Sequence, residues 1–258
     1  MLDLLSRKIT GSRAGRYWLS KLSNHDSFQP LYDIMAWRVQ ASLRLLQKAG
    51  YSPEIVVDIG AHSGEWTQMG LPIFPQARFL MIEAQPEKEK ILDAVRNQAP
   101  QRIEFAMNLL GAESKENVDF FMCDLGSSVY VENTSFPTER VSLPMLTLDT
   151  VLRGHDMVGS TFIKIDVQGA ELDVLAGATE TLKRTDAVLL EASLVEYNKG
   201  APRIGEVIAH MAELGFILFD ICDLRRIGSV LAQTDLIFIR KGSTLDAQAQ
   251  SVITNWGA

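Results

Sequence analysis

Four short apolar runs of this sequence end in acidic residues, namely Asp58, Glu83, Asp166 and Glu191. Such runs are typical of buried strands, and in an open parallel sheet the ligand crevice lies at the carboxyl ends of the strands. The four carboxylates are therefore expected to face one crevice. Carboxylates that share a crevice raise one another's pKa unless a cation balances them. The pattern predicts a positively charged occupant, either a sulfonium cofactor or a metal ion.

A glycine-bracketed turn, Gly60-Ala61-His62-Ser63-Gly64, follows the first run. Its glycines let the backbone approach a ligand and adopt positive φ. A dinucleotide site needs a glycine where this chain has His62, and Asp58 would repel a pyrophosphate. S-adenosylmethionine fits better, because an acidic strand end can face its cations while loop N–H groups bind its carboxylate. Gly60, His62 and Gly64 are thus candidate cofactor residues. The alternative is an ordinary strand-to-helix turn.

Three further residues are candidates to bind the nucleoside of such a cofactor. Glu83 falls 19 residues after Gly64, where an acid can accept hydrogen bonds from both ribose hydroxyls. Asn108, near the end of the third expected strand, and Asp124, in the loop beyond it, are candidates to contact adenine or the ribose. A carboxylate that faces solvent is the alternative for Glu83.

Methyl transfer to an alcohol needs a base or a metal ion near the hydroxyl, because a protonated alcohol is a poor nucleophile. Asp166 is the first candidate for either role and Glu191 the second, and together they offer oxygen ligands suited to Mg²⁺. Structural hydrogen bonds to loop N–H groups are their alternative. Lys164 is expected to neutralise Glu191, to reach the substrate, or to extend to the sheet margin. The candidates for the acceptor pocket are Gln168, Tyr197 and Asn198.

The elements that would position these residues alternate between strand and helix from residue 51 onward, which indicates a parallel sheet with crossover helices. Strands are expected up to Asp58 and over residues 78–83, 103–110, 162–166, 187–191, 216–221 and 235–240. Helices are expected over 31–49, 86–97, 146–152 with Thr147 as N-cap, 170–184 and 203–214. A hairpin is expected to pair 117–122 with 127–131. The predicted organisation is a basic arm and helix over 1–50, one α/β domain over 51–241 and a polar tail over 242–258.

Composition limits the classes of partner. The chain has 258 residues, 47% of them hydrophobic, and a net charge of −7, which argues against nucleic acid as the main partner. Residues 1–50 carry eight basic and three acidic residues, as in a solvated arm or one that touches an anionic partner. No apolar run approaches the roughly 18–20 residues of a membrane span. Cys123 and Cys222 lie far apart in apolar runs, which predicts a cytoplasmic protein without a disulfide framework. Formation of a homo-oligomer is left open.

Five segments resemble, in order, the FkbM-type S-adenosylmethionine-dependent methyltransferases. They are residues 57–64, 82–86, 147–152, 164–178 and 190–191, and the Lys-Ile-Asp-Val-x-Gly-Ala-Glu block that begins at Lys164 is the most specific. The resemblance covers roughly residues 51–222. It implies a Rossmann-like, seven-stranded class I methyltransferase sheet with helices on both faces and an antiparallel last strand. It also implies O-methylation of a hydroxyl on a sugar or other secondary metabolite. The family usually has Glu where this chain has Gln168, which cannot take a proton and is expected to orient a neighbour or the substrate.

The leading hypothesis is an S-adenosylmethionine-dependent O-methyltransferase that acts on a small hydroxylated acceptor. A nicotinamide-dependent oxidoreductase is the first alternative, and His62 and Asp58 argue against it. A catalytically silent binding module that keeps the cofactor fold is the second alternative, suggested by Gln168.

Overall fold

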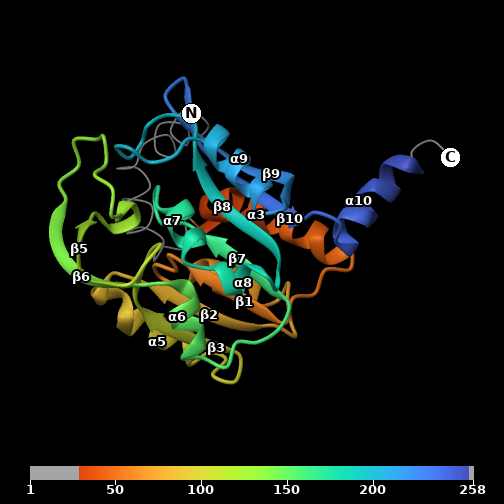
Figure 1. Ribbon diagram of the computed structural model, residues 1–258, viewed down its shortest axis with the longest axis horizontal. Coiled ribbons are helices and arrows are strands. Elements are labelled where there is room, and N and C mark those ends of the chain that lie inside the picture. The colour runs from red at the N-terminus through yellow and green to blue at the C-terminus, as the bar shows by residue number, and fades with distance from the viewer. Residues whose placement is uncertain (1–28, 256–258) are drawn as a thin grey trace.

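The computed structural model describes residues 29–255, with side chains from residue 39 onward. The first 28 residues of the predicted basic arm lie outside the described residues. In the described part, seven strands form one sheet in the order β3-β2-β1-β7-β8-β10-β9, shown in Figure 1. Neighbouring strands are parallel except that β10 runs antiparallel to both β8 and β9. The strands are β1 (Ile55–Ile59), β2 (Arg78–Glu83), β3 (Ile103–Met107), β7 (Thr161–Ile165), β8 (Thr185–Ser193), β9 (Phe216–Ile227) and β10 (Val230–Arg240).

Helices cover both faces of this sheet, as the sequence predicted (Figure 1). Strand β1 shows why, because Val57 packs into the core under one face and Val56 into the core under the other. A strand buried on both faces is apolar throughout. The helices are α3 (Gln29–Lys48), α4 (Glu65–Gly70), η1 (Pro86–Lys88), α5 (Glu89–Arg96), η2 (Asp124–Gly126), α6 (Leu148–Arg153), α7 (Glu171–Ala176), α8 (Thr179–Leu182), α9 (Ile204–Glu213) and α10 (Thr244–Thr254). None of the described helices is both long enough and apolar enough to span a membrane.

Two helix predictions have clear outcomes. Thr147 is the N-cap of α6, and its side chain accepts a hydrogen bond from the Thr150 N–H, as predicted. The single helix expected over 170–184 is instead two helices, with a break around Gly177. A Cβ at Gly177 would lie 2.2 Å from the Gly111 carbonyl oxygen, so this glycine lets the neighbouring loop approach closely. The expected polar tail contains α10, whose Leu245 is buried.

The hairpin prediction was wrong. Strand β5 (Lys115–Met122) pairs antiparallel with β6 (Glu139–Leu146), and residues 127–131 contribute only an isolated bridge at Ser128. A short strand, β4 (Leu109–Leu110), lies parallel to β6 and completes a second, three-stranded sheet. The strand expected over 103–110 is therefore divided at Asn108 between two sheets.

Candidate active site

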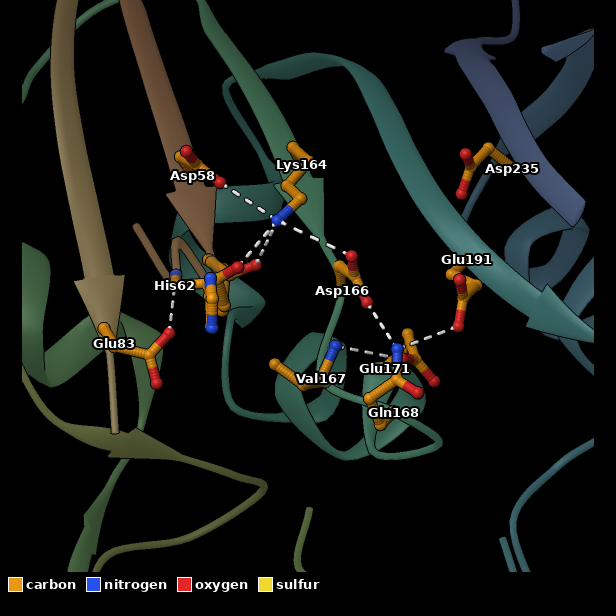
Figure 2. Close-up of polar contacts among 12 residues, drawn as sticks. Asp58, His62, Glu83, Lys164, Asp166, Val167, Gln168, Glu171, Glu191 and Asp235 are labelled. Atoms are coloured by element: carbon orange, nitrogen blue, oxygen red, sulfur yellow. Dashed lines mark hydrogen bonds and ion pairs between the residues drawn. The ribbon is translucent and has the colours of Figure 1, made fainter. Parts of the chain in front are cut away.

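A cavity opens at the carboxyl ends of β1, β2 and β7. Together with the open space at its mouth it spans about 640 Å³. Polar lining comes from the ends of these three strands and from the turns after them, as Figure 2 shows for Glu83, His62 and Asp166. Apolar lining comes from β4, β5 and the loop after β5, with Leu109, Leu110, Phe120, Leu125 and Val129. The cavity thus combines a charged part with an apolar part.

The structure divides the predicted site residues into two groups. Those that line the cavity are Gly60, His62, Glu83, Asn108, Asp124, Asp166 and Gln168. Those that do not line it are Asp58, Gly64, Lys164, Glu191, Tyr197 and Asn198. Each member of the second group has a contact that accounts for its position.

The two glycines of the turn after β1 have different roles. Gly60 has a φ of +69°, and a Cβ there would lie 1.9 Å from the carbonyl oxygen of Asp166. Gly64 also has a positive φ, of +74°, but a Cβ there would meet the side chains of Met81 and Val95 at 3.1 Å. Gly60 therefore shapes the floor of the cavity, whereas Gly64 allows close packing in the core.

The first three N–H groups of this turn are paired within the protein. Those of Gly60 and Ala61 donate to the carbonyl oxygen of Ile82 at 2.9 and 3.1 Å. The His62 N–H donates to Oε2 of Glu83 at 2.7 Å. Contrary to the expectation from sequence, these three groups are not available to a cofactor carboxylate.

Glu83 is held by backbone donors on both of its oxygens. In addition to the His62 bond, Oε1 accepts from the N–H groups of Ala84 at 2.8 Å and Gln85 at 2.9 Å. The residue is only 5% exposed, so it is not the solvent-facing carboxylate considered as an alternative. Because a carboxylate oxygen can accept more than one hydrogen bond, Glu83 can still accept from a ligand.

Asp124 links the loop after β5 to the glycine turn. Its Oδ1 lies 2.8 Å from both Lys88 Nζ and His62 Nε2. Burial opposes ionisation of Asp124, but these two partners hold its pKa below the ordinary value. Lys88 was not predicted, and its position one turn beyond β2 gives no sequence signal for this contact.

Backbone strain also identifies the cavity. Within residues 29–255, the non-glycine residues with positive φ are His62 (49°), Asp124 (49°) and Gln168 (55°), and all three line the cavity. Left-handed conformations at such residues cost free energy and persist where surrounding contacts hold them, often at ligand sites. The strained residues therefore lie together at this cavity, which makes it the candidate site.

Asp58 and Lys164 form a buried ion pair beneath the turn. Asp58 is fully buried, and its Oδ1 lies 3.1 Å from Lys164 Nζ. Its Oδ2 accepts a hydrogen bond from the Thr67 hydroxyl at 2.8 Å. Lys164 therefore neutralises Asp58 rather than Glu191, and it neither reaches the cavity nor extends to the sheet margin.

Gln168 joins the two predicted catalytic acids. Its Nε2 donates to Asp166 Oδ1 at 2.8 Å and to Glu191 Oε1 at 2.9 Å (Figure 2). Burial raises the pKa of Glu191 to about 8. Burial also opposes ionisation of Asp166, but Lys164, Arg225 and the Gln168 amide together hold its pKa below the ordinary value. The site thus pairs a readily ionised carboxylate at the cavity with a less acidic carboxyl behind it.

Arg225 on β9 is a cation of the site that the sequence did not reveal. It forms an ion pair with Glu191 and lies 3.4 Å from Asp223 and 3.7 Å from Asp235. Arg225 and Lys164 supply positive charge that the sequence argument had assigned to a ligand or metal. Asp58 and Glu191 therefore need no ligand or metal ion to balance their charge. Only the acids that line the cavity still call for a positively charged ligand.

Glu171 is a second residue that sequence reasoning missed. Its Oε1 accepts hydrogen bonds from the N–H groups of Val167 at 3.2 Å and Gly169 at 3.1 Å. These bonds hold the turn that carries Gln168 into the cavity. Burial raises the pKa of Glu171 to about 7. An acid two residues after a glycine, in the most specific block of the sequence, was the available signal.

Tyr197 and Asn198 support a loop instead of lining the cavity. The Tyr197 carbonyl accepts from the Asn133 N–H at 2.9 Å, and Asn198 forms a bridge with Glu132. Both are buried. The described residues contain no group of three or more His, Cys, Asp or Glu side chains placed to hold a metal ion, so the Mg²⁺ prediction has no support here.

Comparisons with known proteins agree with this geometry. The family model of the methyltransferase FkbM domain matches residues 58–218, more than half of the chain. This chain therefore belongs to the FkbM methyltransferase family. A search of curated protein sequences gave no match.

Two solved structures that are similar to this chain differ in how much of their own length it covers. The FkbM methyltransferase of Methylobacillus flagellatus KT is 18% identical, with a TM-score of 0.45, over 72% of this chain and 43% of that one. The magnesium protoporphyrin IX methyltransferase of Synechocystis PCC 6803, solved with bound SAM, is 10% identical, with a TM-score of 0.47, over 92% and 96%. This chain thus spans less than half the length of the Methylobacillus protein.

Proposed function

We propose that this protein transfers a methyl group from S-adenosylmethionine to a hydroxyl of a small acceptor, such as a sugar, a glycoconjugate or a secondary metabolite. The observation that carries the proposal is that Glu83 and Asp166 line one cavity together with Gly60 and an apolar patch. We assign the methyltransferase domain to residues 51–241 and the protein to the cytoplasm. We expect no nucleic acid partner, and self-association stays open.

The donor set of the cavity suits a nucleoside with a positively charged tail. Glu83, fixed by three backbone N–H donors, is an acceptor for ribose hydroxyls. The apolar lining, with Leu109 and Leu125, suits the flat adenine ring, and Asn108 and Asp124 offer polar groups beside it. Asp166 offers a negative charge to the sulfonium side.

When bound, S-adenosylmethionine supplies a methyl group that its sulfonium has already activated. The protein must then position the acceptor and exclude water, and positioning can contribute roughly 7–11 kcal/mol to lowering the barrier. We propose Asp166 as the group that accepts the hydroxyl proton, because it lines the cavity and stays ionised beside Lys164. Gln168 orients Asp166, and Glu191 stands behind it as the second acid.

Calorimetric titration with S-adenosylhomocysteine and with NAD tests the cofactor. We expect S-adenosylhomocysteine to bind and NAD not to bind, because Asp166 and Glu83 would repel a pyrophosphate. Binding of NAD alone would favour an oxidoreductase instead.

Asp166→Asn tests the chemistry, with transfer of labelled methyl to a panel of hydroxylated acceptors as the assay. We expect transfer to fall by about 10²-fold or more, as for a general base. Glu180→Gln, which alters an acid whose side chain is 66% exposed, is the control. Unchanged transfer by Asp166→Asn would remove Asp166 from this role. Cofactor binding with no transfer to any acceptor by the wild-type protein would favour a silent binding module.

A further inference from the structure

We infer that Lys164 is a positioning residue for the glycine turn after β1, residues 60–64, and that it does not contact the acceptor. The inference deepens the proposed function and rests on it, because it concerns how the turn at Gly60 keeps the shape that a cofactor would meet. The sequence had suggested instead that Lys164 neutralises Glu191 or reaches the substrate.

The Lys164 ammonium has four partners inside the protein, two backbone carbonyls and two carboxylates. Nζ donates to the carbonyl oxygen of Gly60 at 2.8 Å and of Ile59 at 3.2 Å. It also lies 3.1 Å from Oδ1 of Asp58 and 4.0 Å from Oδ2 of Asp166. Figure 2 shows these contacts converging on Nζ from β1 and β7. The side chain is 6% exposed and does not line the cavity, so Lys164 is not placed to contact a substrate.

These contacts fix the end of β1 and the first residue of the turn after it. Ile59 is the last residue of β1, and its carbonyl also accepts from the Asp166 N–H at 3.1 Å. Gly60 follows with positive φ and lines the cavity. By holding both carbonyls, Lys164 ties the turn after β1 to the strand that carries Asp166. The turn and the acid therefore keep a fixed relation to one another.

The charge of Lys164 is matched to its surroundings. Its side chain is 6% exposed, and although burial disfavours the ammonium, Asp58 and Asp166 raise its pKa above the ordinary value. An ammonium held in this way does not release its proton near neutral pH, so Lys164 is unsuited to proton transfer. It is suited to holding two carbonyls and one buried carboxylate.

A pair of variants separates positioning from folding. Lys164→Met alone leaves Asp58 buried without its cation, which destabilises a protein strongly. The double variant Asp58→Asn with Lys164→Met removes both charges, and the asparagine can still accept from the Thr67 hydroxyl. We expect the double variant to melt within a few degrees of wild type. It should nevertheless bind S-adenosylhomocysteine at least tenfold more weakly, equal to about 1.4 kcal/mol.

The conservative variant Lys164→Arg keeps a charged donor and is expected to bind S-adenosylhomocysteine within about threefold of wild type. The control Lys183→Met, at a lysine with a 69% exposed side chain, should leave affinity and melting temperature unchanged. A double variant that binds as tightly as wild type would overturn the positioning role alone. A Lys164→Arg variant as weak as the double variant, at equal stability, would overturn it too. Failure of the wild-type protein to bind would refute the proposed cofactor, and the inference with it.

Discussion

Gly60→Ala tests whether the close approach of two strand ends defines the cavity floor. The alanine Cβ would lie 1.9 Å from the Asp166 carbonyl oxygen, whereas real Cβ contacts stay beyond 3.0 Å. The turn after β1 or the end of β7 would therefore have to move by about 1 Å. Because Lys164 also holds the Gly60 carbonyl, such a movement would disturb the carbonyl, the ammonium and Asp166 together.

Two contributions set the expected loss of stability. A non-glycine residue at positive φ costs roughly 1–2 kcal/mol, and overpacking in a tight site costs roughly 1–3 kcal/mol more. Together they predict a loss of about 2–5 kcal/mol in the free energy of unfolding. For a chain of this size each kcal/mol lowers the melting temperature by about 2–4 °C. The melting temperature is therefore expected to fall by about 4–20 °C.

Two other glycines separate these contributions. Gly200 has a φ of +79°, but a Cβ added there would meet nothing within 4 Å, and Gly205 has neither a positive φ nor a close neighbour. Gly200→Ala should therefore show the backbone cost alone. Gly205→Ala, in α9, should be neutral or slightly stabilising, since alanine is the better helix former.

Thermal melting and titration with S-adenosylhomocysteine measure both consequences. Gly60→Ala should melt clearly below Gly200→Ala and should bind S-adenosylhomocysteine at least tenfold more weakly than either control. If Gly60→Ala melted within 1 °C of Gly200→Ala and bound normally, the close contact with Asp166 would not define the site.

Three further changes test other parts of the molecule. Glu171→Gln keeps the oxygen that accepts from Val167 and Gly169 but cannot ionise. Burial raises the pKa of Glu171 from 4.5 to about 7, so between these pH values the folded state holds a proton that the unfolded chain releases. Wild type should therefore lose stability relative to this variant as pH rises from about 4.5 to 7. Urea midpoints at pH 5 and 8 measure this loss. Thr147→Ala removes the N-cap of α6 and should cost about 1 kcal/mol, whereas Thr147→Ser should not; thermal melting distinguishes them. Glu83→Gln should weaken S-adenosylhomocysteine binding at least tenfold by calorimetry, and unchanged affinity would remove Glu83 from the cofactor site.

The main sheet was predictable because its strands carry a strong local signal. Strands buried on both faces are continuous apolar runs, and β1, β2 and β7 lie within one residue of their predicted bounds. Strand β6 was not predictable in this way. It belongs to the small second sheet, has exposed Glu139 and Arg140 at its start, and contains Pro144, which is rare inside strands. The alternation of Val141, Leu143 and Met145 with more polar residues was the available signal. The pairing of β6 with β5 across a long loop depends on the tertiary structure and has no local sequence signal.

The glycine turn and the acids at the strand ends were predictable from spacing, but the direction of each carboxylate was not. A strand's side chains alternate between the two faces of the sheet, and a short turn beyond its end changes that direction again. Glu83 and Asp166 reach the cavity, whereas Asp58 lies under the turn against Lys164. Position at the end of a strand therefore identifies candidates, and only the surrounding contacts decide which of them face a ligand.

The cationic partners of two of these acids come from strands far along the chain. The sequence therefore wrongly suggested that a ligand must balance all four carboxylates. Arg225 lies 34 residues after Glu191 and meets it only because β10 and β9 fold back beside β8. Once Lys164 and Arg225 have neutralised Asp58 and Glu191, a ligand has to satisfy only the acids that remain at the cavity. A cationic ligand then needs to balance Asp166, with Glu83 acting as a hydrogen-bond acceptor. This smaller requirement suits one sulfonium cofactor, and it gives Lys164 and Arg225 the task of keeping the other carboxylates from competing for it.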